Sequence, residues 1–202
     1  ADANWLCEGK IKKENILIQS DRLEFYYKWA KVLVDKGAAY ICTCDSEKFK
    51  ELLASSILCP CRNLSLLEIS LRYDMMFNDY KQGEAVMRFK SDITHKNPAM
   101  RDFPLMRINE SVHARQGTKY RVWPLMNFSV SVDDLETNVT HTLRAKDHAD
   151  NALRQAMIHE VLGFKTPEAI SVGRINFDGF DLSTSATRLK IKEGVYDGWD
   201  DI

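Results

Sequence analysis

Two closely spaced cysteine pairs constrain the fold of this chain more than any other feature. Cys42 and Cys44 form the first pair, Cys59 and Cys61 form the second, and fourteen residues separate them. Four thiolates can meet tetrahedrally around one Zn²⁺ when the stretch between the pairs folds back on itself. The plainer interpretation is four unrelated buried or surface thiols, which two Cys-x-Cys pairs in so short a stretch disfavour. The pattern predicts a structural zinc site, because four thiolates leave no open position for a substrate.

The composition is that of a globular protein with a hydrophobic core. Of the 202 residues 45% are hydrophobic, which suits one or two compact units. No apolar run reaches the roughly 18 residues of a membrane span, and no secretory signal is visible. We therefore expect no membrane partner and a cytoplasmic location, where reduced thiols favour metal over disulfides. Because the net charge is −1, any contact with nucleic acid must come from local basic patches, such as Lys10–Lys13 or Arg188–Lys192.

Hydrophobic periodicity predicts a mixture of helices and strands. Apolar residues recur on one helical face after Asp21, and Gly37 stands where a helix C-terminal glycine belongs. A later helix is predicted to be capped by Asp147 and to end at Gly163. The other predicted helices cover 45–58 and 65–81, and the predicted strands cover 16–18, 40–42, 84–90, 105–108, 139–143 and 170–177.

The segment Tyr120–Phe128 has the residues of a small polar pocket. Trp123 can exclude water, and Asn127 can form hydrogen bonds with a polar ligand. The alternative is that Trp123 and Phe128 are core side chains, as aromatic residues at this spacing usually are. Asp133-Asp134, a little further on, is predicted to be a turn or a helix start without a catalytic role.

Arg144 follows the strand predicted over 139–143, at the edge where an α/β sheet presents its ligands. A guanidinium group there can hold a carboxylate by two parallel hydrogen bonds. The alternative is a surface arginine that pairs with Asp147 or Glu160. The hydroxyl-rich stretch Leu182–Arg188 comes after a predicted hairpin turn, and its hydroxyls and backbone N–H groups suit the binding of phosphates.

In this order, these segments resemble the later half of the catalytic domain of class I glutamyl-tRNA synthetases of the archaeal and eukaryotic cytosolic type. The resemblance covers nearly the whole chain. It implies an α/β fold, in which a partial Rossmann-type catalytic core is interrupted by a zinc-stabilised α+β module that binds the tRNA acceptor stem. The implied parts are the first half of the core over 1–37, the inserted module over 38–119, the second half of the core over 120–175, and the signature loop with the start of the stem-contact region over 176–202.

The resemblance also implies an amino-acid pocket. Trp123, Asn127 and Arg144 match positions that bind glutamate. Many members carry tyrosine in place of Trp123, so one hydrogen bond to the substrate is lost here. Glutaminyl relatives carry an uncharged residue in place of Arg144, because an unpaired buried cation would reject an amide. Arg144 therefore favours glutamate. Similar cysteine pairs occur in archaeal-type members, where they tie down the inserted module.

The ATP side of the site is implied in the same way. Asp147 and His148 match positions beside the adenosine, although a lone histidine at a helix start often has no function. Ala186 stands where the standard second signature loop carries a lysine, which leaves Arg188 as the nearest cation. The residues that match this catalytic loop, whose hydroxyls and N–H groups assist pyrophosphate release, are Ser183, Thr184, Ser185 and Arg188.

The implied activity is that of a glutamate–tRNA ligase, which uses L-glutamate, ATP with Mg²⁺ and the acceptor end of tRNA. The first class I signature, His-x-Gly-His, is formed by none of the five histidines of the sequence. We therefore expect an interior piece of a longer enzyme, inactive by itself and completed by an N-terminal half and anticodon-binding domains. Two alternatives stay open: a glutaminyl-tRNA synthetase fragment, and a non-catalytic synthetase-derived module that binds zinc and RNA.

Overall fold

The computed structural model describes residues 16–173 and 183–200. The chain divides into two compact units, one that ends at Ser171 and one that begins at Val172, and each is described by itself. The basic cluster near Lys10, the end of the strand predicted over 170–177 and the hairpin turn predicted after it lie outside the described residues.

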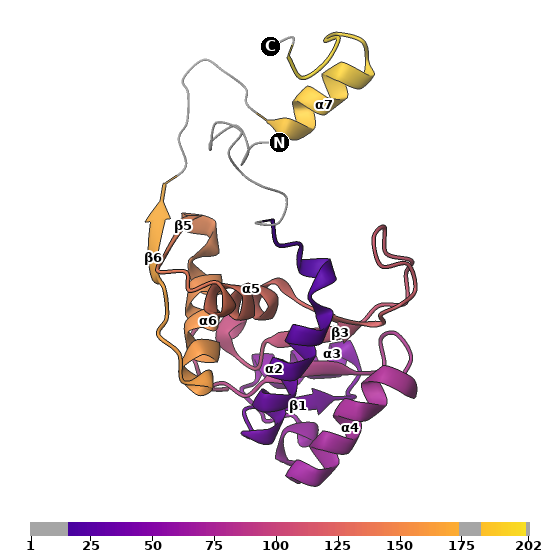
Figure 1. The fold of residues 1–202 in the computed structure, drawn as a ribbon, viewed down its shortest axis with the longest axis vertical. Coiled ribbons are helices and arrows are strands. Elements are labelled where there is room, and N and C mark those ends of the chain that lie inside the picture. The colour runs from indigo at the N-terminus through magenta and orange to yellow at the C-terminus, as the bar shows by residue number, and fades with distance from the viewer. Residues whose placement is uncertain (1–15, 174–182, 201–202) are drawn as a thin grey trace. The chain divides into compact units, whose positions relative to one another are not determined.

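A four-stranded antiparallel sheet forms the centre of the first unit (Figure 1). Every strand pairs with its neighbour in the sequence, and Arg107 of the third strand lies opposite Trp123 of the fourth. Predicted strands over 40–42, 84–90 and 105–108 are confirmed, whereas the fourth strand was not predicted. The strands, in their order across the sheet, are β1 (Ala39–Cys42), β2 (Val86–Phe89), β3 (Pro104–Ile108) and β4 (Val122–Pro124).

Three predicted helices of the first unit are confirmed, namely α2 (Leu23–Asp35), α3 (Ser46–Ala54) and α4 (Leu66–Asn78). α2 packs against both α4 and β1, and Figure 1 shows these elements side by side. Asp45 and Ser65 accept hydrogen bonds from first-turn N–H groups, which starts α3 and α4. The side chains that α2 buries recur with helical spacing and are Leu23, Tyr26, Ala30, Leu33 and Val34.

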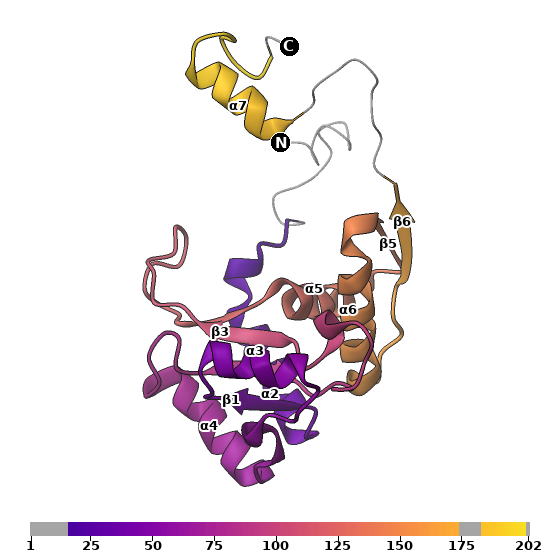
Figure 2. The same ribbon diagram turned by 180° about the vertical axis from the view of Figure 1, so that it is seen from behind.

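The rest of the first unit contains two more helices and a two-stranded sheet (Figure 2). α5 (Met126–Glu136) packs against α6 (Ala149–Leu162), and both helices contact α2. β5 (His141–Ala145) pairs with β6 (Glu168–Val172), and the short 3₁₀ turn η5 (Lys146–His148) joins β5 to α6. Because α6 connects the two strands, this part of the chain has the order strand, helix, strand.

Several local predictions are wrong. Ile16–Ile18 forms no strand, and its apolar side chains are exposed. β5 forms near the strand predicted over 139–143, but Leu143 is 71% exposed. Asp147 does not cap α6, because it lies within η5 and the helix begins at Ala149 without a side-chain cap. Gly163 does end this helix with a φ of +81°, as predicted.

α5 is the longest element that the sequence did not predict. Asp133-Asp134 lies near its end, so the prediction of a turn or helix start at these residues is wrong. The buried positions Asn127, Phe128, Ser131 and Val132 do repeat with helical spacing. Two of these four are polar, which hides the apolar periodicity from which helices are recognised.

The second unit contains the helix α7 (Thr184–Lys192). Ser183 caps α7, since its Oγ accepts a hydrogen bond of 3.3 Å from the backbone N–H of Ala186. Over the described parts of both units, no helix is long and apolar enough to cross a membrane.

Candidate functional site

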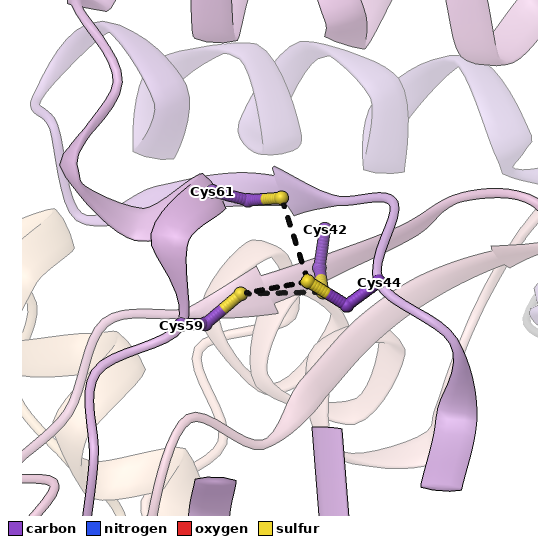
Figure 3. A group of neighbouring side chains, drawn as sticks. All are labelled: Cys42, Cys44, Cys59 and Cys61. Carbon is purple, nitrogen blue, oxygen red and sulfur yellow. Dashed lines mark hydrogen bonds between the residues drawn. The ribbon is translucent and has the colours of Figure 1, made fainter. Parts of the chain in front are cut away.

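The four paired cysteines come together at the end of β1 (Figure 3). Cys42 is the last residue of β1, Cys44 lies in the turn before α3, and Cys59 and Cys61 belong to the start of the 3₁₀ turn η3 (Pro60–Asn63). All four Sγ atoms lie within 4.8 Å of one another, and Cys44 and Cys59 are separated by 3.5 Å. A tetrahedral zinc with Zn–S distances of about 2.3 Å needs sulfur atoms about 3.8 Å apart. The donor set and its spacing therefore fit zinc.

The cysteine thiols differ in how readily they ionise. The pKa of Cys42 is lowered to about 5, because a hydrogen bond from Cys59 outweighs the effect of burial. Burial raises the pKa of Cys44 to about 11. A bound divalent cation would favour the thiolate form of all four side chains. Arg72 adds positive charge beside them, since its Nη1 lies 3.5 Å from Sγ of Cys61.

A fully buried acid anchors the second cysteine pair to the sheet. Asp102 is 0% exposed and forms an ion pair of 3.0 Å with Nε of Arg62, the residue after Cys61. The same carboxylate accepts hydrogen bonds of 2.9 Å from the Tyr40 hydroxyl and from the backbone N–H of Ser91. These bonds fix η3, and with it the two cysteines, against β1.

Trp123 lies on β4 and lines a hollow of about 190 Å³ with Tyr26, Ser129 and His113. The His113 ring stacks on the Trp123 indole with a centroid distance of 4.7 Å. His113 belongs to the loop over 109–119, in which a single bridge joins His113 to Gly117. This stacking was not predicted, because nothing in the sequence links the loop to β4.

Two contacts hold this loop over the Trp123 hollow. Nη2 of Arg115 lies 2.7 Å from the Asp21 carboxylate, and Nε2 of Gln116 lies 2.6 Å from it. Beneath the loop, Nε1 of Trp123 is buried without a hydrogen-bond partner among the described residues, as is Oδ1 of Asn127 on the first turn of α5. Buried polar atoms of this kind are candidates for ligand contacts.

Arg144 lies on β5, and its side chain is 17% exposed. Its Nη2 is 3.6 Å from Oδ2 of Asp134 on α5, rather than near either predicted partner, Asp147 or Glu160. The Arg144 side chain lines a small hollow of about 20 Å³, which shares no residue with the hollow that Trp123 lines. The structure thus leaves Trp123 and Arg144 in separate hollows.

Three further polar side chains surround Arg144, and none was predicted to have a role. Asp134, Gln155 and His159 line the same small hollow. Gln155 and His159 are four residues apart on α6 and buried, at 3% and 1% exposure. Burial raises the pKa of Asp134, and the positive charge of Arg144 offsets this only in part. Two polar residues at helical spacing within the buried face of α6 were the available signal in the sequence.

The predicted ATP-side residues lie in different parts of the structure. Asp147 and His148 are exposed in η5, and His148 Nδ1 lies 3.1 Å from the Asn151 side chain on α6. Thr184 and Ser185 form the first turn of α7, with Arg188 on the same helix. Because the two units are described separately, a meeting of α7 with Arg144 stays a prediction.

The sequence matches a known protein family over nearly its full length. Residues 2–202 match the family described as tRNA synthetases class I (E and Q), catalytic domain. The chain is 49% identical to a glutamate–tRNA ligase of Pyrococcus horikoshii over 99% of its own length, and 47% identical to one of Methanothermobacter thermautotrophicus over 100%. It spans only 35% and 36% of the lengths of these relatives.

Solved structures agree on the fold. The glutamate–tRNA synthetase of Elizabethkingia anophelis matches 87% of this chain with a TM-score of 0.55 at 17% sequence identity, and the match covers 38% of that protein. A glutamate–tRNA ligase of Elizabethkingia meningosepticum gives a TM-score of 0.52 at 19% identity. With residues 2–202 matched, the chain belongs to the catalytic-domain family of the class I tRNA synthetases for glutamate and glutamine.

Proposed function

We propose that this chain is part of a glutamate–tRNA ligase, which activates glutamate with ATP and transfers it to tRNA. The observation that carries the proposal is Arg144, a largely buried cation near the end of β5 whose one acidic partner among the described residues is 3.6 Å away. A guanidinium group has five N–H donors, so donors remain for the side-chain carboxylate of a substrate. The similarity to glutamate–tRNA ligases supports this choice, and because the chain spans 35% of such a relative the activity belongs to the longer protein.

The residues then take the following roles. Arg144 pairs with the side-chain carboxylate of glutamate. Trp123, which lines a separate hollow, and Asn127 are assigned to the rest of the amino acid. Asp147 and His148 lie on the adenosine side. The pyrophosphate is bound by the start of α7, where backbone N–H groups and hydroxyls favour an anion. The members of that group are Ser183, Thr184, Ser185 and Arg188.

The reaction needs positioning rather than a protein nucleophile. An oxygen of the glutamate α-carboxylate attacks the α-phosphorus of ATP, and the bond to pyrophosphate breaks while Mg²⁺ offsets the phosphate charge. A ribose hydroxyl of the tRNA end then attacks the activated carbonyl, and AMP leaves. Holding the reactants in line and stabilising the charge of the leaving group supply the rate.

We further propose that residues 38–119 are an acceptor-stem-binding module inserted into a Rossmann-type core whose parts are 1–37 and 120–175, and that 176–202 begin the stem-contact region. The antiparallel sheet and the cysteine cluster support a distinct module, whereas the strand, helix, strand order of β5, α6 and β6 suits the core. Zinc held by the four thiolates would crosslink β1 to η3 and take no part in the chemistry.

The test is tRNA charging by the protein that the complete reading frame around these residues encodes. We expect glutamate to be attached and glutamine to be rejected, because an amide leaves the Arg144 charge unpaired. Arg144→Gln should abolish most of this preference, and Arg107→Gln, a neutralised arginine on β3, is the matched control. Charging with glutamine by the unmodified protein would support the glutaminyl alternative. Zinc and RNA binding without any charging would support the non-catalytic module.

A further inference from the structure

Arg144 is contacted from one side by a carboxylate that is slightly more buried than the arginine itself. The side chains of Arg144 and Asp134 are 17% and 14% exposed, and Oδ2 of Asp134 has no partner in the described structure other than Nη2 of Arg144. One edge of the guanidinium therefore faces an acid on α5. A planar guanidinium that is fixed at one edge presents its remaining donors in a defined direction.

Buried polar side chains of α6 lie beside Asp134 and Arg144. His159 donates from Nε2 to the Ser131 carbonyl at 3.0 Å, and its Nδ1 is buried with no partner among the described residues. Gln155 lines the same hollow of about 20 Å³, which has room for about one water-sized group. Asp134 thus lies between this small hollow and a larger one of about 540 Å³, and its Oδ2 contacts Arg144 at 3.6 Å.

We propose that Asp134 is a positioning residue for Arg144 and thereby determines the preference for a carboxylate over an amide substrate. This inference rests on the proposed function, in which Arg144 binds the side chain of glutamate. Asp134 occupies one edge of the guanidinium and leaves the other edge to donate two parallel hydrogen bonds to a substrate carboxylate. Without Asp134, the long arginine side chain is free to leave the geometry that bidentate binding requires.

Asp134→Asn is the informative substitution, because it keeps the shape of the side chain and removes the charge. Desolvation raises the pKa of Asp134, so the charged carboxylate opposes folding at neutral pH. The substitution removes this cost but leaves Arg144 without its acidic partner, so the two effects on the melting temperature oppose one another. The positioning role is therefore tested by KM and substrate preference rather than by stability.

The experiment compares Asp134→Asn, Asp134→Glu and Glu136→Gln in the protein that the complete reading frame encodes. Glu136→Gln is the matched control, since it removes the same charge from the same helix and its carboxylate bonds to Trp29. The measurements are kcat and KM for charging of tRNA with glutamate and with glutamine. We expect Asp134→Asn to raise KM for glutamate about tenfold and to lower the glutamate preference, with kcat little changed, because misplaced binding groups have effects of this order. Asp134→Glu should restore part of the preference.

The outcomes separate the two proposals. If Arg144→Gln abolishes the preference while Asp134→Asn keeps both KM and preference, the positioning role is wrong and the proposed function stands. A lower KM for glutamate in Asp134→Asn also overturns the positioning role, because it would mean that the acid only repels the substrate. If the unmodified protein charges no tRNA with glutamate, the proposed function itself fails.

Discussion

The cysteine cluster and the Arg144 region are built in different ways. The four cysteines lie on β1, the next turn and η3, within twenty residues of sequence, and their sulfur atoms are already at zinc-binding distances. Arg144 instead depends on α5 and α6, and its predicted partners on α7 belong to a separately described unit. A site made from neighbouring residues is set by local folding, whereas one made from distant elements depends on packing and on the rest of the protein.

Loss of the zinc site should produce the largest effect on stability, because it would unfold the region around the cysteine cluster. Structural zinc contributes on the order of 10 kcal/mol of binding energy to folding in small zinc domains. We therefore expect Cys59→Ser to lower the melting temperature by about 20 °C or more, given about 2–4 °C per kcal/mol for chains of this size. Metal analysis should give one zinc per chain before the change and less after it.

Cys7→Ser is the control for this prediction, since it makes the same chemical change at the cysteine outside both pairs. It should alter neither the zinc content nor the melting temperature. If the Cys59→Ser chain binds no metal but has the same melting temperature as the unmodified chain, the cluster is held by packing alone.

Asp102→Asn should produce the next largest effect on stability. This substitution tests whether the cysteine region depends on its buried anchor. The substitution leaves Arg62, which is 18% exposed, without its carboxylate. An ion pair broken in this way costs about 3 kcal/mol or more, which corresponds to a melting temperature lower by about 10 °C. Zinc affinity, measured by competition with a chromogenic chelator, should fall too, because η3 loses its attachment to β1.

The exposed Asp92, which accepts hydrogen bonds from Thr94, provides the control. Asp92→Asn should change stability by no more than about 0.5 kcal/mol, as is usual for surface substitutions. Equal zinc affinity in Asp102→Asn and the unmodified chain would mean that the cysteine cluster keeps its geometry without the Asp102 anchor.

The sequence predicted the region around the cysteines better than the region around Arg144, and the reason is physical. The apolar periodicity of α2 and the alternation in β2 each mark one face that is buried by apolar side chains. The spacing of the cysteines by itself predicts a four-thiolate metal site. For these elements, local pattern and final structure agree.

Prediction from the sequence failed where the buried side chains are polar, or where burial depends on residues that are far away in the sequence. α5 buries Asn127, Ser129 and Ser131 beside its apolar residues, so its periodicity was hidden. Asp134 was given no role, because only the packing of α5 beside β5 brings it to Arg144. The exposure of Leu143 was equally unpredictable, since an alternating apolar strand is normally recognised by the side that it buries.

His113→Ala should have the smallest effect on stability. It tests whether the loop over Trp123 belongs to the Arg144 region. An aromatic pair contributes about 0.5–1.5 kcal/mol, so the melting temperature should fall by about 2–4 °C. The sharper measurement is Trp123 fluorescence, because removal of the stacked ring changes the surroundings of the indole. Val112→Ala, at a side chain that is 75% exposed on the same loop, should change neither quantity. If the fluorescence change persists when His113→Ala is made in a Trp123→Phe background, it comes from another tryptophan and the loop does not cover the hollow in solution.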